Sequence, residues 1–148
     1  MPLLTEDKEN TFEFGKGRVI AKGKDLAIIA TGETVYPALQ AAKKLKEDYN
    51  VEATVVSMHT IKPLDYNLLK SLANEVGAII TVEEHSVYGG LGEACASFLL
   101  ENQFHKPFKI VGIPDEYTVT GSQTEILNHY GISEEGLTKT ALELIKKT

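Results

Sequence analysis

The sequence has a single cysteine, no long apolar run and no excess of basic residues. One thiol, Cys95, excludes an internal disulfide and a zinc site built from several cysteines. The longest fully apolar run, Leu26–Ala30, is far shorter than the roughly 20 residues of a membrane-spanning helix. Acidic residues outnumber basic ones by 21 to 15, and no basic stripe indicates nonspecific nucleic-acid binding. No secretory leader is visible, so we expect a cytoplasmic protein that binds neither membrane nor nucleic acid.

The length of 148 residues and the 43% hydrophobic content are typical of one globular domain. Residues 1–16 read as a polar, extended lead-in, whereas residues 17–148 alternate strand and helix patterns. A short strand is predicted at 18–21. Apolar strands are predicted at 26–30, 52–58, 78–82 and 108–113, each followed by a helical pattern.

This alternation predicts an α/β fold with three α/β/α layers around a mainly parallel five-stranded sheet. The run 18–21 is joined to the next strand by a tight turn at 23–25, so it should be the short antiparallel strand at an edge. Asp65 and Ser133 are predicted to cap helices, and Ser122 with Glu125 to form a capping box. Pro37 should lie in the first turn of its helix, where a missing N–H costs nothing.

Most of the chemically interesting side chains follow the predicted strands, at the edge where ligands bind in open α/β sheets. We call this carboxyl edge the rim. Its segments are residues 31–34, 57–60, 83–86 and 114–116. The rim is either an active or binding edge or the ordinary set of polar loops that ends any parallel sheet.

The most conspicuous segment is the glycine-rich turn at Gly89, Gly90 and Gly92, directly before a helical pattern. Read as G-x-G-x-x-G from Gly90, its last position is Cys95, so the dinucleotide fingerprint fails. The turn can present backbone N–H groups to an anion, or it can serve close chain packing, for example at a subunit interface. Both interpretations stay open, and the residues favour packing.

Acid–base or metal chemistry could come from Glu83, Glu84 and His85 at the end of a strand. In a strand Glu83 and His85 point one way and Glu84 the other. A Glu–His pair could move protons or join His59 in binding a metal, but a hydrogen-bonded structural histidine is commoner. We expect a buried core thiol at Cys95, and helix C-terminal positions for two further histidines, His105 and His129.

Several segments, taken in order, resemble the C-terminal domain of transketolases. Residues 22–32 are similar to the start of that domain, and residues 60–65 to its Thr-Ile-Lys-Pro-Leu-Asp segment. Residues 81–85 and 89–94 resemble its Glu-Asp/Glu-His and Gly-Gly-x-Gly-Glu-Ala signature. The ordered match runs from about residue 14 to residue 147.

The resemblance implies part of a thiamine-diphosphate enzyme that moves two-carbon ketol units between sugar phosphates in pentose-phosphate metabolism. In that family the cofactor and a divalent metal (Mg or Ca) lie between two other domains, whose motifs have no counterpart here. The resemblance therefore implies no catalytic, cofactor-binding or metal-binding residue in this chain. Residues 1–16 resemble the tail of the segment that joins the pyrimidine-binding domain to this one. The chain therefore resembles an excised C-terminal domain or part of the second subunit of a split enzyme.

The resemblance also implies a structural, dimer-organising role, with the cofactor-binding domains or an N-terminal subunit as partners and a homodimer as the assembly. Glu84, His85, Gly89, Gly90 and Gly92 are then candidates for an interface facing the other domains. Alternatives are a free-standing anion-binding or partner-binding module, and the related domain of deoxyxylulose-phosphate synthase or of a 2-oxo-acid dehydrogenase beta subunit.

Overall fold

The structure is a computed structural model that describes residues 16–58, 64–86, 90–113 and 121–146. Within these ranges the side chains of His85, Ser86 and Gln123 are not described. The predicted lead-in lies outside the described residues, apart from Lys16.

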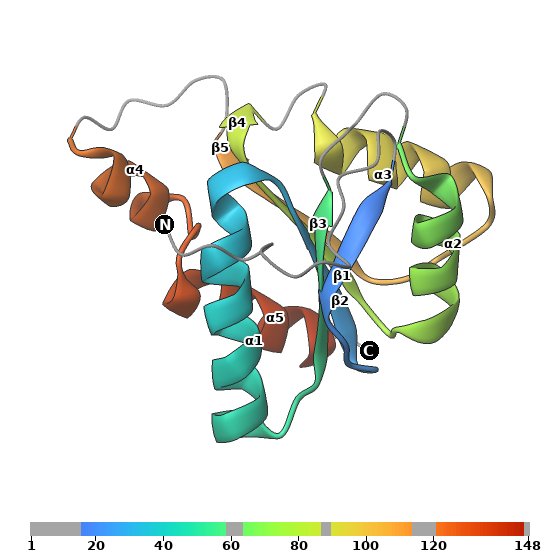
Figure 1. Ribbon diagram of the computed structural model, residues 1–148, viewed down its shortest axis with the longest axis horizontal. Helices are drawn as coiled ribbons and strands as arrows, with labels where there is room; N and C mark the ends of the chain where they lie inside the picture. Colours follow the sequence, from blue (N-terminus) through green and yellow to red (C-terminus); the bar gives the residue numbers. More distant parts are fainter. Residues whose placement is uncertain (1–15, 59–63, 87–89, 114–120, 147–148) are drawn as a thin grey trace, which may run out of the picture.

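The described residues form a five-stranded sheet in the order β1-β3-β2-β4-β5 (Figure 1). β2 pairs in parallel with β3 and β4, β4 pairs in parallel with β5, and β1 pairs antiparallel with β3. The predicted mainly parallel sheet with one antiparallel edge strand is therefore confirmed. The strands are β1 (Gly17–Ala21), β2 (Leu26–Ala30), β3 (Ala53–Met58), β4 (Ile79–Ser86) and β5 (Phe108–Ile113).

Helices cover both faces of the sheet, which completes the three predicted layers (Figure 1). One face carries α1 (Val35–Tyr49) and α5 (Glu134–Lys146), and the other carries α2 (Tyr66–Glu75) and α3 (Leu91–Glu101). A short 3₁₀ turn, η1 (Gly32–Thr34), precedes α1, and α4 (Gln123–His129) precedes α5. In the described part of the chain, no helix combines the length and the apolar character needed to cross a bilayer.

β2 shows why the sequence forms this layered core. All five of its residues are buried. Leu26, Ile28 and Ala30 pack in the cluster that includes α1 and α5, whereas Ala27 and Ile29 pack in the cluster that includes α2 and α3. A strand covered on both faces has no solvent side, so its sequence is an unbroken apolar run.

The edge strand β1 pairs with β3, although the tight turn after it leads into β2. Gly23 in that turn lies against the start of β3, where an added Cβ would be 2.5 Å from the backbone N of Ala53. The hydroxyl of Thr54 accepts a hydrogen bond from the Gly23 N–H at 2.9 Å and donates one to the Gly23 carbonyl. These contacts hold the turn against the start of β3. The chain therefore crosses the end of β3 between β1 and β2, which lie on either side of that strand.

The predicted helix starts at the C-terminal end of the chain are also confirmed. Ser122 and Glu125 form the reciprocal capping box at α4, with bonds of 3.2 and 3.3 Å. Ser133 Oγ accepts the Gly136 N–H at 3.0 Å at the start of α5. Pro37 lies in the first turn of α1, as expected.

Candidate functional site

The rim of the sheet is only partly described. Residues 59–60, 89 and 114–116 lie outside the described residues, and so do the predictions made for them. The described part consists of residues 31–34 after β2, the end of β3 and the end of β4, and the first turn of α3 adjoins it. The His85 side chain is not described, so its pairing with Glu83 or His59 stays a prediction.

Glu83 is the buried charged group of the rim, with 2% of its surface exposed. Its Oε1 accepts the Leu91 N–H at 3.1 Å, and its Oε2 accepts the Gly92 N–H at 3.0 Å. These N–H groups belong to the first turn of α3, where backbone N–H groups have no acceptor within the helix. The negative carboxylate also lies at the positive end of the helix dipole. The two hydrogen bonds and the dipole therefore offset the free-energy cost of burying the charge.

Two glycines leave the space that this arrangement needs. A Cβ on Gly90 would lie 2.1 Å from Glu83 Oε1. A Cβ on Gly92 would lie 2.5 Å from Ile110 Cγ2 and 2.9 Å from Thr81 Oγ1. The described part of the glycine-rich turn therefore serves close packing of α3 on β4 and β5, and its two amides already bind an internal carboxylate.

Glu84 lies on the opposite side of β4 from Glu83, as strand alternation predicts. Its Oε1 accepts the Glu33 N–H at 3.4 Å in the η1 turn. Gly32 in that turn has a φ of +53°, and an added Cβ would lie 2.9 Å from Glu84 Oε1. The buried Thr34 hydroxyl donates to the Val82 carbonyl at 3.1 Å and so fixes η1 on the end of β4.

Asp65, the N-cap of α2, is a third carboxylate that binds backbone N–H groups, and the sequence predicts only one of its two bonds. Its Oδ1 accepts the Leu68 N–H at 3.1 Å, which confirms the predicted cap of α2. Its Oδ2 accepts the Gly17 N–H at 2.9 Å, so the same buried side chain also holds the start of β1. No local pattern indicates this second bond, because 48 residues separate the partners.

The thiol of Cys95 is fully buried in the cluster with α2 and α3, as predicted. Burial, reinforced by the charge of Glu83, raises its pKa to about 12. The thiol therefore stays protonated and is a poor nucleophile near neutral pH. Nearby, the Thr81 hydroxyl is buried and has no hydrogen-bond partner among the described residues.

The described histidines do not form a metal site. His129 is the last residue of α4, as predicted. Its ring lies edge-on to the ring of Tyr130, and the two ring centroids are 4.8 Å apart. His105 was expected at a helix end but lies in the loop after α3, because α3 ends at Glu101 and the chain turns through Gln103 at a φ of 65°. Within the described ranges, no three His, Cys, Asp or Glu side chains come together in a group able to hold a metal ion.

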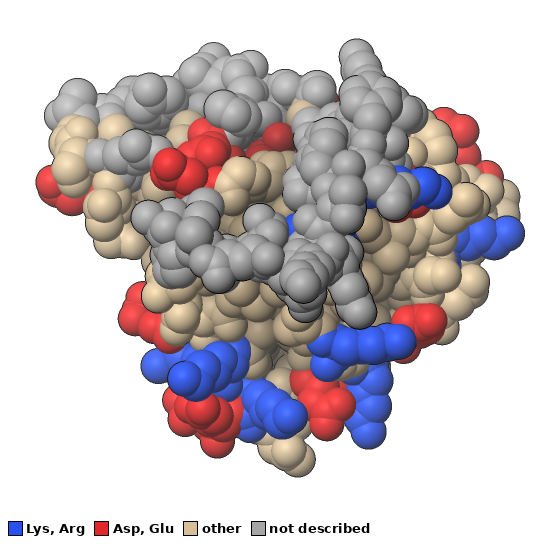
Figure 2. Space-filling view, viewed as in Figure 1, with Lys and Arg blue, Asp and Glu red and all other residues tan. Residues whose placement is uncertain are grey.

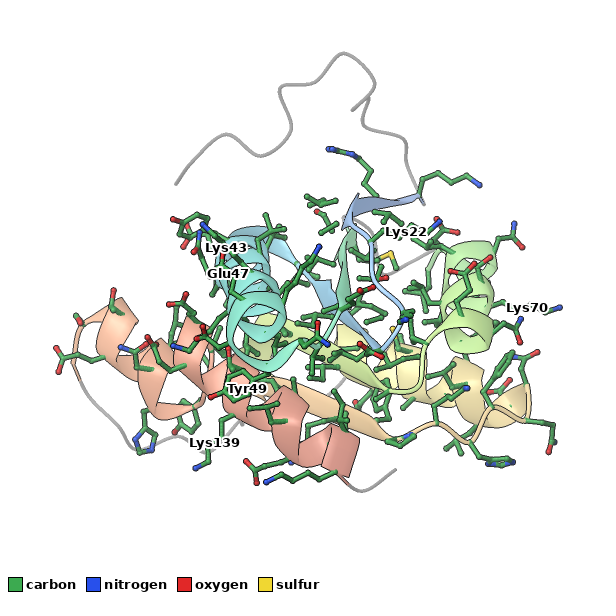
Figure 3. The ribbon with its side chains drawn as sticks, turned by 90° about the horizontal axis from the view of Figure 1, so that it is seen from below. Lys22, Lys43, Glu47, Tyr49, Lys70 and Lys139 are labelled. Carbon is green, nitrogen blue, oxygen red and sulfur yellow. The ribbon has the colours of Figure 1, made fainter. Side chains whose placement is uncertain are left out.

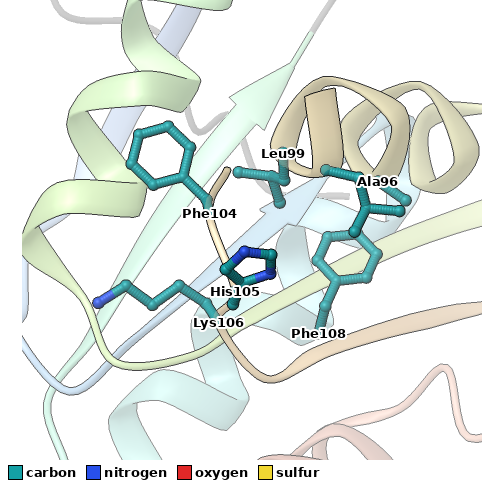
Figure 4. A pocket seen from close by; sticks show the side chains of 7 residues that line it. Ala96, Leu99, Phe104, His105, Lys106 and Phe108 are labelled. Carbon is teal, nitrogen blue, oxygen red and sulfur yellow. The ribbon is translucent and has the colours of Figure 1, made fainter. Parts of the chain in front are cut away.

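An apolar hollow of about 370 Å³ lies away from the rim, beside α3 and the start of β5 (Figure 4). It is lined by Ala96, Leu99, Leu100, Phe104, His105, Lys106 and Phe108. The lining contains no carboxylate, and the hollow lies at the amino end of β5. It therefore does not join the rim carboxylates in one site.

The charged side chains of both signs are mixed over the part of the surface where α1 ends (Figure 2). Lysines and acidic residues lie side by side at the end of the molecule where α1 ends (Figure 2). Lys22 and Lys43 line one hollow together with Glu52, whereas Lys70 and Lys139 project from other parts of the fold (Figure 3). On α1, Lys44 and Asp48 form an ion pair at 3.9 Å. This mixture agrees with the absence of a basic stripe in the sequence.

The fold and the rim together define a three-layer α/β/α domain whose described rim carboxylates hold its own strand and helix starts. The family described as "Transketolase, C-terminal domain" matches residues 15–137. The chain belongs to this family, and the resemblance predicted from its sequence is confirmed.

The relatives that match are longer proteins. One, an apulose-4-phosphate transketolase subunit of Phocaeicola vulgatus, is 47% identical over 99% of this chain and 46% of its own length. Another, a "Putative transketolase C-terminal section" of Methanocaldococcus jannaschii, is 42% identical over 98% of this chain and 45% of its own length. The chain thus spans a little under half the length of these relatives.

A solved structure described as "Split gene transketolase, inactive beta4 tetramer" has the same fold. It superposes with a TM-score of 0.87 at 35% identity, over 96% of this chain and 46% of that one. The three-layer architecture of this chain therefore matches part of a solved split transketolase.

Proposed function

We propose that the chain is the C-terminal domain of a transketolase-type transferase that moves two-carbon ketol units between sugar phosphates. The observation that carries the proposal is the family match over residues 15–137, in a chain that spans under half of relatives named as one subunit or one section of a transketolase. The domain organises the assembly, and the reaction takes place on other domains. Pentose-phosphate carbohydrate metabolism in the cytoplasm is the setting that we propose.

The described residues do not fit the thiamine diphosphate and divalent metal of this enzyme class. A diphosphate–metal centre needs free carboxylate or carbonyl oxygens arranged around the ion. The Glu83 and Asp65 carboxylates each accept two backbone N–H groups, and Glu84 accepts one. We therefore propose that other domains hold the cofactor and the metal (Mg or Ca).

The partner that we propose is the cofactor-binding part of the same enzyme, on an N-terminal subunit or on preceding domains. Residues 1–16 are the segment that leads from a pyrimidine-binding domain into this one, and residues 17–148 are the domain itself. The relative named as a transketolase subunit and the tetrameric split transketolase support an assembly from several chains. We propose a homodimeric arrangement of the complete enzyme, with Glu84, His85, Gly89, Gly90 and Gly92 on the side that faces the other domains.

Calorimetry and a ketol-transfer assay test this proposal. The purified chain is titrated with thiamine diphosphate and Mg²⁺, and no binding heat is expected. Sugar-phosphate conversion is then followed for the chain alone, for the cofactor-binding part alone and for both together, and activity is expected only for the mixture. Micromolar cofactor binding by this chain, or ketol transfer by it unaided, would contradict the proposal.

A further inference from the structure

We propose that Glu83 is a positioning residue for the rim, because its carboxylate sets where α3 begins relative to the end of β4. This inference rests on the proposed function for its catalytic consequence, but its structural part concerns the chain itself. Glu83 is 2% exposed, and its two oxygens accept the Leu91 and Gly92 N–H groups at 3.1 and 3.0 Å.

The bond pattern differs from an ordinary helix cap. The residue at the N-cap position of α3 is Gly90, which has no side chain to offer. The capping group comes instead from β4, eight and nine positions before its two donors. A local cap holds only its own helix. This carboxylate instead connects the end of β4 to the start of α3.

Glu83 and Gly90 are sterically matched. A Cβ on residue 90 would lie 2.1 Å from Glu83 Oε1, a distance that the backbone and the carboxylate cannot both accommodate. Any side chain at position 90 therefore displaces either the carboxylate or the first turn of α3. The pair predicts that Gly90→Ala and substitutions of Glu83 disturb the same two amides.

The neighbouring carboxylate, Glu84, shows which part of the rim depends on Glu83. Glu84 holds the Glu33 amide of η1 on one side of β4, while Glu83 holds α3 on the other side. Two consecutive residues thus connect the end of β4 to the helix starts on both faces of the sheet. Loss of Glu83 releases only the α3 side, where Gly90 and Gly92 lie among the candidate interface residues.

The Leu91 and Gly92 amides are already occupied by the Glu83 carboxylate, so we expect no free anion to bind there in the unsubstituted chain. Glu83→Ala removes the carboxylate and leaves two N–H donors beside the buried Thr81 hydroxyl, which has no partner among the described residues. Formate is the matching probe, since it supplies a carboxylate of the same shape. We expect millimolar formate to bind Glu83→Ala and not the unsubstituted chain.

The first test uses amide NMR on the chain itself. In Glu83→Ala the Leu91 and Gly92 amide signals should shift, the Glu33 signal should stay, and formate should return the shifted signals toward their original positions. Glu84→Ala is the matched control, and it should move Glu33 but not Leu91 or Gly92. If Glu83→Ala does not fold, Glu83→Gln and Gly90→Ala take its place, and both should shift the same two amides. Unchanged Leu91 and Gly92 signals would overturn the inference.

The second test uses the chain assembled with its cofactor-binding partner. In the proposed assembly the rim faces the domains that carry out the reaction, and a misplacement of about an ångström that starts far from the chemistry can cost up to about a hundredfold in rate. We expect Glu83→Ala to lower kcat about tenfold or more, with KM for the donor sugar phosphate within about twofold, and formate to restore kcat. Glu101→Gln, at the exposed far end of α3, should retain full activity.

The outcomes separate the two proposals. An inactive assembly of the unsubstituted chain contradicts the proposed function, while the NMR result on Glu83 stands independently. Shifted amides combined with unchanged kcat would refute the catalytic consequence of Glu83 and leave the proposed function intact.

Discussion

Replacing Asp65 with alanine should destabilise the fold by an amount that its two hydrogen bonds define. The side chain is 7% exposed. Its Oδ1 accepts the Leu68 N–H at 3.1 Å in the first turn of α2, and its Oδ2 accepts the Gly17 N–H at 2.9 Å at the start of β1. Asp65→Ala leaves both donors without their acceptor and adds no new contact.

The two losses can be added as separate contributions to the free energy of unfolding. Removing a helix N-cap costs about 1 kcal/mol. Removing a charged acceptor from a partly buried N–H costs about 1.5–3 kcal/mol. Asp65→Ala should therefore lower the free energy of unfolding by about 2.5–4 kcal/mol. Asp65→Ser keeps an N-cap oxygen for Leu68 but cannot also bond Gly17, so it should lose only about 1.5–3 kcal/mol.

Urea denaturation followed by circular dichroism measures both values, provided the transition slope is unchanged. Asp48→Ala is the control, because Asp48 is an exposed aspartate whose ion pair with Lys44 spans 3.9 Å, and it should change the free energy by less than about 0.5 kcal/mol. An Asp65→Ala loss as small as that of the control would refute the reasoning. An Asp65→Ser loss as small as that of the control would refute the role of the Gly17 bond, whereas equal losses for Asp65→Ala and Asp65→Ser would refute the separate contribution of the Leu68 cap.

Two further outcomes concern α3 and the strands under it. Gly92→Ala should lower the free energy of unfolding by about 1–3 kcal/mol in the same urea assay, because the added Cβ would lie 2.5 Å from Ile110 Cγ2. A change below about 0.5 kcal/mol would contradict this close packing. Burial and the charge of Glu83 raise the Cys95 pKa from 9.0 to about 12, so only the unfolded thiol ionises between these values and stability falls as pH rises. This group should contribute a decline of about 1.4 kcal/mol per pH unit across that window. The difference between the unsubstituted chain and Cys95→Ala measures it, and identical pH profiles would contradict the burial of the thiol.

The layered fold could be predicted from the sequence because its signals are local. An apolar run such as Leu26–Ala30 indicates a strand buried on both faces, and Ser122 with Glu125 indicates a helix start. The pairing of β1 with β3 could not be predicted in this way. It depends on the contact of Gly23 with Ala53 and Thr54, which lie thirty or more positions away in the chain.

The rim shows the same limit more sharply. Strand alternation predicted that Glu83 and Glu84 point to opposite sides, and both carboxylates do so. The alternation did not predict that Glu83 is buried, since a carboxylate is ordinarily a solvent-facing residue. Its burial depends on the Leu91 and Gly92 amides, whose position is set by the packing of α3 rather than by any local pattern.

The use of these carboxylates bears directly on function. The carboxyl edge of a parallel sheet is where α/β proteins usually bind ligands, because polar loops and helix N-termini meet there. Here Glu83 fills the α3 start, Glu84 holds η1, and Asp65 caps α2 and holds β1. These three carboxylates, which could otherwise serve a substrate, are thus engaged by the scaffold itself. In the function that we propose, this edge faces the domains that hold the cofactor, and its scaffold role agrees with a reaction that takes place on those domains.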